Sequence, residues 1–212
     1  MDDQATVIAV YVPSPPEFDA IEGWENAPAV QIRHLWSGEP APPERYAVVR
    51  LCWSPNGLHV RFLCEQREPL IVSDSPALDK KTLGLWDRDV CEVFLAPDAD
   101  NPSTYYEFEA APTGEWVDLA LNITPSGRQT EWDYSSGMKA FAGVASDFTL
   151  IGITIPWSPR IPKPAAGEIW KVNLFRCVGP HPTERYLAWQ PTRTPEPNFH
   201  VPDAFGWLRF EG

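Results

Sequence analysis

Proline is the residue that most restricts how this chain can fold. The sequence has 24 prolines among 212 residues, about 11% and roughly twice the average usage. Because proline lacks an amide hydrogen and has a fixed φ, it is excluded from helix interiors and from central strands. The chain is therefore predicted to consist of short elements joined by many turns.

A β-hairpin is predicted where two alternating runs, 46–53 and 58–64, flank the sequence Ser-Pro-Asn-Gly. Asn-Gly is a strong hairpin-turn dipeptide, and the pairing that it implies leaves one face wholly apolar. The same register sets Cys52 opposite His59 on the other face, so Cys52 and Cys64 are expected to be free thiols. The expected pairs on the apolar face are Trp53 with Leu58, Leu51 with Val60, Val49 with Phe62, and Ala47 with Cys64.

Further short segments have the apolar and aromatic composition of strands, and no segment predicts a helix. Turn residues separate them at roughly ten-residue intervals, which is typical of an antiparallel sandwich. We therefore predict a single all-β domain over residues 1–212, an immunoglobulin-like or jelly-roll-like antiparallel β-sandwich of about ten or eleven strands. The further segments are Val30–Leu35, Asp89–Leu95, Tyr105–Ala110, Trp116–Leu121, Lys139–Val144, Thr149–Ile155, Ile169–Val178, Arg185–Trp189 and Trp207–Phe210.

The charge and the aromatic content narrow the class of partner. With 17 Lys and Arg against 29 Asp and Glu, the formal charge is -12, which repels phosphate backbones and anionic lipid surfaces. Neither nucleic acid nor a membrane is an expected partner. Ten tryptophans exceed what a core of this size needs, and the remainder would suit a neutral, hydroxyl-rich ligand.

The start of the chain predicts no signal peptide, because it is acidic and its apolar stretch 6–12 lacks a basic region before it and a cleavage site after it. The chain as written is expected in the cytoplasm. The alternative is a periplasmic or secreted protein from which a signal peptide was removed. The four cysteines show no CxxC spacing, which argues against a zinc or redox motif.

A tryptophan and a carboxylate meet at the strand 89–95. Trp86 precedes this strand and Glu92 lies within its apolar body. A buried glutamate needs a partner because desolvating a charge is costly. Glu92 is expected either to pair with a neighbouring arginine or to accept hydrogen bonds from sugar hydroxyls beside Trp86.

Strand 105–110 alternates, with Tyr105, Glu107 and Glu109 on one face and Tyr106 on the other. Two carboxylates on one face of a strand could form an acid and base pair. Glycoside hydrolysis, however, needs the two groups opposed across the scissile bond. The pattern therefore favours an ordinary half-exposed strand over catalysis.

Near the carboxyl end, a strand ending in Trp189 leads into a proline-stiffened loop that carries Asn198, Phe199 and His200. A stiff loop with aromatic and amide groups suits sugar recognition, since rings stack on sugar faces and little ordering entropy is lost. The alternative is that Phe199 plugs the end of the sandwich.

Taken in order, these motifs resemble family 9 carbohydrate-binding modules and their DOMON-like relatives, over nearly the whole chain from about Trp24 to Phe210. Members of that family are β-sandwiches that hold the end of a sugar chain between two aromatic rings, often with structural calcium. The motifs that carry the resemblance are Trp86, Asp89, Glu92–Leu95, Tyr105–Phe108, Trp170–Arg176, Trp189 and Phe205-Gly206.

The resemblance implies that Trp86 is one of the two rings that stack on the sugar and that Glu92 accepts hydrogen bonds from sugar hydroxyls. The second ring is either Trp189 or Phe199. Tyr106 and Arg176 lie in matching motifs and join the candidate sugar-binding residues. The alternative role of Arg176 is an ion pair with Glu92.

The calcium of the family has one candidate site here, the turn that holds Asp98, Asp100 and Asn101. Oxygen ligands at alternating positions can hold this ion, although an acidic turn of this kind can also be simply solvated. The histidines show no metal-ligand spacing. They are His34, His59, His181 and His200.

The sequence thus predicts a non-catalytic carbohydrate-binding module, free-standing or part of a glycoside-processing system. A DOMON-type haem domain for electron transfer is the main alternative, and it requires Met or His axial ligands at the mouth of the sandwich. Met1 and Met138 are the methionines of the chain. A glycoside hydrolase is the third functional hypothesis.

Overall fold

The computed structural model describes residues 5–180 and 183–212, so Met1 and His181 lie outside the described residues. The described part contains strands and three short 3-10 turns, η1 (Pro43–Arg45), η2 (Leu85–Asp87) and η3 (Pro202–Ala204). None of it forms a helix long and apolar enough to cross a membrane. The strands are β1 (Thr6–Tyr11), β2 (Val30–Ile32), β3 (His34–Leu35), β4 (Ala47–Ser54), β5 (Gly57–Glu65), β6 (Val90–Ala96), β7 (Thr104–Ala110), β8 (Trp116–Thr124), β9 (Gly127–Glu131), β10 (Lys139–Val144), β11 (Phe148–Pro156), β12 (Ile169–Cys177), β13 (Tyr186–Ala188) and β14 (Gly206–Glu211).

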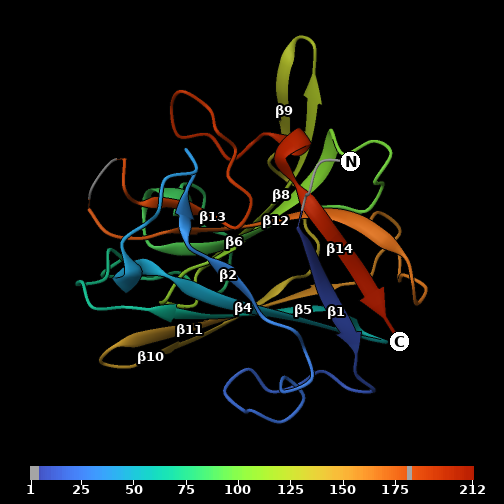
Figure 1. Ribbon diagram of the computed structural model, residues 1–212, viewed down its shortest axis with the longest axis horizontal. Coiled ribbons are helices and arrows are strands. Elements are labelled where there is room, and N and C mark those ends of the chain that lie inside the picture. The colour runs from blue at the N-terminus through green and yellow to red at the C-terminus, as the bar shows by residue number, and fades with distance from the viewer. Residues whose placement is uncertain (1–4, 181–182) are drawn as a thin grey trace.

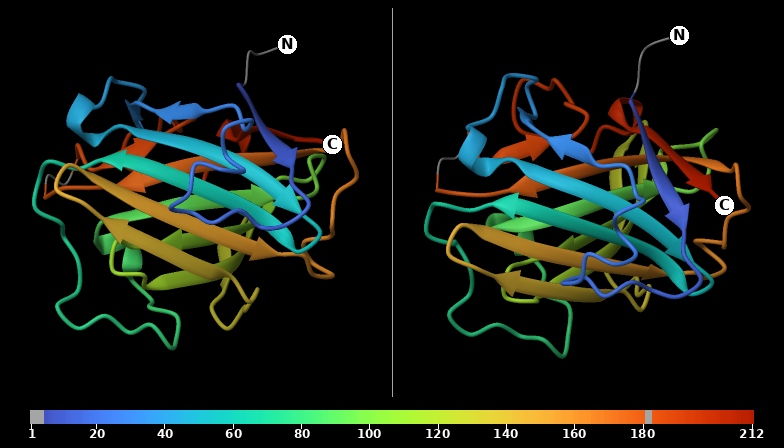
Figure 2. Two further views of the ribbon diagram at one scale, coloured as in Figure 1. Left: turned by 90° about the horizontal axis from the view of Figure 1, so that it is seen from below. Right: turned by 60° about the horizontal axis from the view of Figure 1, so that its bottom comes forward.

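The strands hydrogen-bond in one continuous path, β10-β11-β5-β4-β1-β14-β12-β6-β7-β8-β9. The path folds over into two layers, with β10, β11, β5 and β4 in one and β12, β6, β7 and β8 in the other (Figure 2). Parallel strands β1 and β14 join the layers along one side (Figure 1). All-β architecture with mainly antiparallel pairing is confirmed, and the fourteen strands of the described residues exceed the ten or eleven that the sequence predicted.

The main core lies between the two layers. It gathers Val60 and Phe62 from β5, Val93 from β6, Ile153 from β11 and Trp170 from β12, each fully buried. Strand alternation explains this, because every second side chain of each strand points to the same face.

The predicted hairpin is confirmed in its register. Trp53 pairs with Leu58, and Cys52 pairs with His59. Cys64 instead lies across the core from Cys91, with 3.5 Å between their sulfurs, and both thiols are free and buried.

The structure adds two strands that the sequence did not predict, β1 and β9, and divides 30–35 into two. Strand β9 escaped prediction because it is polar and mostly exposed, so it shows no alternation of apolar residues. With β8 it forms the hairpin that projects from the body of the protein (Figure 1).

A second buried cluster lies on the outer face of the β12-β6-β7-β8 layer. Phe94, Tyr105 and Phe175 form its centre, and Phe199 and Phe205 from the C-terminal loop pack on it. This layer is therefore apolar on both faces. The loops that cover its outer face also build the pocket described next.

Candidate functional site

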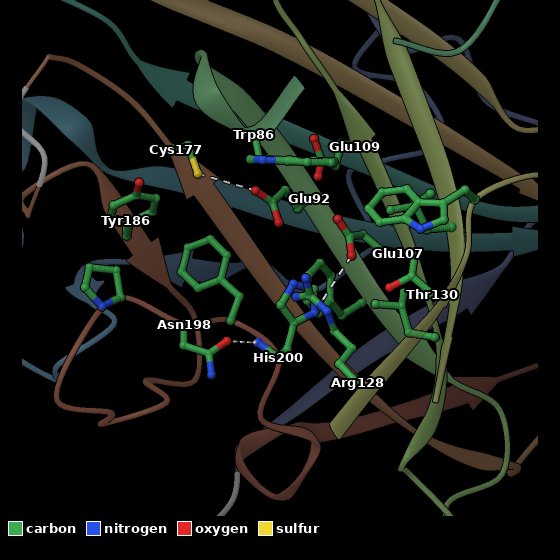
Figure 3. Close-up of a pocket in the computed structure, with 16 residues that line it drawn as sticks. Trp86, Glu92, Glu107, Glu109, Arg128, Thr130, Cys177, Tyr186, Asn198 and His200 are labelled. Carbon is green, nitrogen blue, oxygen red and sulfur yellow. Dashed lines mark hydrogen bonds and ion pairs between the residues drawn. The ribbon is translucent and has the colours of Figure 1, made fainter. Parts of the chain in front are cut away.

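A pocket with a volume of about 300 Å³ opens on the outer face of the β12-β6-β7-β8 layer. Strand register explains which side chains reach it. Glu92 of β6 pairs with Glu109 of β7, and Phe94 pairs with Glu107, so these side chains project from the same face. Figure 3 shows Glu92, Glu107 and Glu109 directed into the pocket from neighbouring strands.

Trp86 forms one wall of the pocket. It lies in η2, at the end of the long irregular segment 66–84, and its ring is half-buried. The buried carboxylate of Asp89 holds this segment in place. It accepts hydrogen bonds from the amides of Ile71 at 3.1 Å and Gly179 at 3.0 Å.

Trp132, just after β9, extends the same wall. Its ring centroid lies 6.4 Å from that of Trp86, with the planes at 43°, and it is 47% exposed. The projecting hairpin also contributes Arg128 and Thr130 to the pocket lining. Two indoles and a cation thus border the opening.

The opposite wall comes from the loop after β13. Phe199 stacks on Phe175 with 4.0 Å between ring centroids, so one of its faces is covered. Asn198 is exposed, and its side-chain oxygen accepts the amide hydrogen bond of His200 at 3.0 Å. Tyr186 of β13 completes this wall.

His200 links the loop to the floor. Its Nδ1 lies 2.8 Å from the Tyr105 hydroxyl and 3.9 Å from Oε2 of Glu107. Burial, reinforced by the nearby Arg128, lowers the pKa of His200 to about 3. The imidazole is therefore neutral at physiological pH, where it cannot serve as a counterion for Glu107.

The floor is a cluster of three carboxyl groups. One ligand atom from each of Glu92, Glu107 and Glu109 lies within 4.8 Å of the others, and all three residues are buried. The Cys177 thiol donates to Oε1 of Glu92 at 3.4 Å. Glu107 and Glu109 share a hydrogen bond between their carboxyl groups, and no other residue donates to Oε2 of Glu107 or to the side-chain oxygens of Glu109.

Burial governs the protonation of this floor. It raises the pKa of Glu92 to about 8, with the charge of Glu107 adding to the effect. Burial and the two neighbouring carboxyl groups also raise the pKa of Glu109 well above its usual value. In a dry site, adjacent carboxyl groups cannot all be ionised, so the free protein holds protons here.

Five of the sequence-predicted site residues meet in this pocket, namely Trp86, Glu92, Asn198, Phe199 and His200. Three others lie elsewhere. Trp189 is 7% exposed and belongs to the interlayer core, as does Tyr106 at 8%. Tyr106 in β7 and Trp189 directly after β13 occupy positions of opposite parity to the pocket residues Glu107 and Tyr186, so they face the other way.

Arg176 also faces away from Glu92, because Phe175 is the residue that pairs with Glu92. Its guanidinium donates to the carbonyls of Arg45 at 2.8 Å and Tyr46 at 3.1 Å, and to Oε1 of Gln66 at 2.7 Å. Arg176 thus ties the two layers together at one end.

The turn proposed for calcium joins β6 to β7, and Asp98, Asp100 and Asn101 are exposed there. Oδ1 of Asp98 accepts the Asp100 amide at 3.1 Å, a bond that shapes the turn itself. Calcium at this turn stays a prediction.

Sequence reasoning did not assign Glu107, Glu109, Arg128 or Trp132 to the site. The alternation of strand 105–110 already placed Glu107 and Glu109 on one face. Pairing this strand with 89–95, so that Glu92 faces Glu109, would have revealed the cluster. No comparable signal identified the polar hairpin that carries Arg128 and Trp132.

One wall of the pocket lies in a segment that matches a known family. Residues 157–210 match the model of carbohydrate-binding family 9. This segment includes β12, β13 and the loop with Asn198, Phe199 and His200. The resemblance to family 9 inferred from the sequence motifs is confirmed over this part of the chain.

Proteins of known structure resemble this chain in fold over almost its whole length. A Bacteroides uniformis protein designated a candidate carbohydrate-binding protein superposes with a TM-score of 0.75 at 18% identity, covering 98% of this chain and 100% of that one. A family 9 carbohydrate-binding module from Caldicellulosiruptor kristjanssonii, in complex with glucose, gives a TM-score of 0.66 at 17% identity, covering 98% and 96%. These likenesses show that the fold is shared.

The amino-acid sequence also resembles that of a curated protein. An extracellular protein of Arthroderma benhamiae is 24% identical over 183 residues, which cover 79% of this chain and 80% of that protein. The relationship therefore extends well beyond the C-terminal segment.

Proposed function

We propose that this protein is a non-catalytic carbohydrate-binding module, and that the pocket over the β12-β6-β7-β8 layer holds a terminal sugar unit. The observation that carries the proposal is the position of the family 9 segment, which supplies one wall of that pocket. Such a module can act alone or attached to a glycoside-processing enzyme.

The chemistry of the walls supports sugar binding. Trp86 and Trp132 offer partly exposed indoles, on which the apolar face of a sugar ring can stack. A volume of about 300 Å³ is at the lower end of the range for small-molecule pockets. It suits one or two sugar units better than the interior of a long chain.

The polar groups supply hydroxyl recognition. Glu92 lies on the floor beneath Trp86, while Asn198, His200 and Arg128 border the opening. Neutral and charged acceptors and donors are both present, as sugar hydroxyls require. A related family 9 module has been solved with cellotriose, which favours β-linked glucose oligomers as the first ligands to test.

The arrangement of carboxyl groups supports binding over hydrolysis. Glu92, Glu107 and Glu109 come from two adjacent strands and lie side by side on one floor. A glycosidase needs its acid and its base or nucleophile on either side of the scissile bond.

Isothermal titration calorimetry with glucose, cellobiose and cellotriose tests this proposal. We expect dissociation constants between about 1 µM and 1 mM, as is usual for a few stacked faces and hydrogen bonds. Chromogenic aryl glycosides should show no turnover. Absence of binding to every sugar tested, or enzymatic turnover abolished by Glu92→Gln, would contradict the proposal.

A further inference from the structure

The pocket floor concentrates more acidic groups than hydroxyl recognition requires. The structure describes one group of three acidic, histidine or cysteine side chains close enough to share a cation, namely Glu92, Glu107 and Glu109. Each of these residues is at most 3% exposed. A buried carboxylate is stable only when it is paired with a charge, hydrogen-bonded or protonated.

The floor has few such partners within the protein. Apart from the hydrogen bond that Glu107 and Glu109 share with each other, both oxygens of Glu109 and Oε2 of Glu107 are buried without a donor, and the contact of Glu92 is with a weak thiol donor. Among the described residues that line the pocket, Arg128 is the only permanent cation, and it is exposed on β9. A bound sugar hydroxyl could donate one hydrogen bond to this floor but could not balance its charge.

The walls indicate what kind of cation fits. The cavity is far larger than a metal ion, and five Trp, Tyr and Phe rings line it, those of Trp86, Phe94, Trp132, Tyr186 and Phe199. Aromatic faces attract organic ammonium groups as well as the apolar faces of sugars. A ligand that carries both an ammonium group and a sugar ring could contact the carboxyl groups of the floor and stack on the aromatic walls at the same time.

A divalent metal ion fits the floor less well. Calcium takes six to eight oxygen ligands, whereas the three residues bring one oxygen each within 4.8 Å of one another. The Arg128 guanidinium at the same pocket would also repel a double charge about twice as strongly as a single one.

We propose that the ligand of this pocket is an amino sugar, a hexosamine unit whose protonated amine lies over Glu92, Glu107 and Glu109 while its ring stacks on Trp86. This inference rests on the proposed carbohydrate-binding function and narrows its ligand class. An ammonium group presents three N–H donors to three carboxyl groups, so each donor finds an acceptor.

The carboxyl groups of the free site hold protons that such a ligand could displace. Burial and mutual repulsion raise the pKa of Glu92 and of Glu109, so protons neutralise part of the floor in the free protein. A bound ammonium favours the ionised carboxylates and releases protons to solvent. Calorimetry in buffers of different ionisation enthalpy should therefore register proton release with an amino sugar and none with a neutral one.

The test compares matched ligands on the full chain at pH 7 with EDTA present. Cellobiose and the β-1,4-linked dimer of glucosamine differ in their amines, and the dimer of N-acetylglucosamine removes the charge while keeping the nitrogen. We expect the glucosamine dimer to bind at least about tenfold more tightly than cellobiose, which corresponds to about 1.4 kcal/mol. The preference should shrink at high salt.

Three results would overturn the inference. Equal affinity for the charged and neutral dimers would refute the amine preference while leaving sugar binding intact. Binding of no sugar at all would refute the proposed function and this inference together. Sugar binding that requires added Ca²⁺ and shows no amine preference would assign the floor to a metal ion.

Isosteric variants test whether the floor carboxyl groups cause the preference for the amino sugar. Glu109→Gln and Glu107→Gln should each reduce the ratio of glucosamine-dimer affinity to cellobiose affinity at least about threefold. Glu115→Gln is the control, since Glu115 is equally buried but bonds to Thr113 at 2.9 Å outside the pocket. Thermal melts verify that each variant folds, and an unchanged ratio in both floor variants would overturn the proposal.

Discussion

Two tryptophans that the sequence placed in one site have different roles in the structure, and truncating each one separates those roles. Trp86 is a half-buried wall of the pocket. Trp189 is 7% exposed, and its ring lies so close to Gly206 that a Cβ there would be 2.6 Å away. We expect Trp86→Ala to weaken sugar binding and Trp189→Ala to weaken the fold.

The magnitudes follow from what each ring loses. Removing a stacking anchor costs about 2 kcal/mol of binding free energy, or roughly a 30-fold increase in Kd. Emptying the Trp189 site should cost roughly 3–5 kcal/mol of unfolding free energy through lost transfer energy and a cavity. For a domain of this size, that loss lowers Tm by about 6–20 °C. Trp86→Ala should change the unfolding free energy by only about 1 kcal/mol, because its ring is already partly in water.

Calorimetry with the tightest-binding disaccharide and differential scanning calorimetry provide both readouts on each variant. Trp189→Phe serves as a milder variant should the alanine variant fail to fold, and it should retain wild-type Kd with a smaller decrease in Tm. The reasoning is refuted if Trp86→Ala melts far below wild type and still binds sugar normally. An intact fold with lost binding in Trp189→Phe would refute it equally.

Three other features give checkable outcomes. The unfolding free energy should fall as pH rises from about 5 to 8, because Glu92 ionises near its ordinary pKa of 4.5 in the unfolded chain but has a pKa of about 8 in the folded protein. Thermal melts across that interval should show a smaller decrease of Tm with pH for Glu92→Gln than for the wild type. A wild-type Tm that rises with pH would contradict this. Cys64 and Cys91 are buried in the core, so a thiol reagent should label them only after denaturation, and rapid labelling of the native protein would count against the interlayer packing. Arg176→Met removes three hydrogen bonds, including that to Gln66, and urea unfolding should show a loss of about 3 kcal/mol with Kd unchanged.

The sequence predicted the layers of the fold well because alternation is a local signal. The hairpin around Asn56-Gly57 specified its own register, and the structure has the same pairs, from Trp53 with Leu58 to Ala47 with Cys64. What alternation does not reveal is which face of a strand meets the core. Trp189 is therefore a candidate stacking ring by its sequence, although Leu187 and Trp189 together face the interlayer core.

The site was harder to predict because it depends on pairing between segments. Glu92 is a candidate on its own because it is an ionisable residue in an apolar strand. Glu109 becomes a candidate only when the pairing that sets it opposite Glu92 is known. Trp132 follows a strand of exposed polar residues whose position is set by its pairing with β8. Alternation within one segment does not identify the distant segment with which it pairs.

A crystal structure of the protein soaked with its tightest-binding disaccharide tests the central claim most directly. The account predicts one sugar unit in the pocket, stacked on Trp86, with an oxygen or nitrogen atom within hydrogen-bond distance of Glu92. Sugar density on the outer face of the β10-β11-β5-β4 layer, with this pocket holding only solvent, would contradict it.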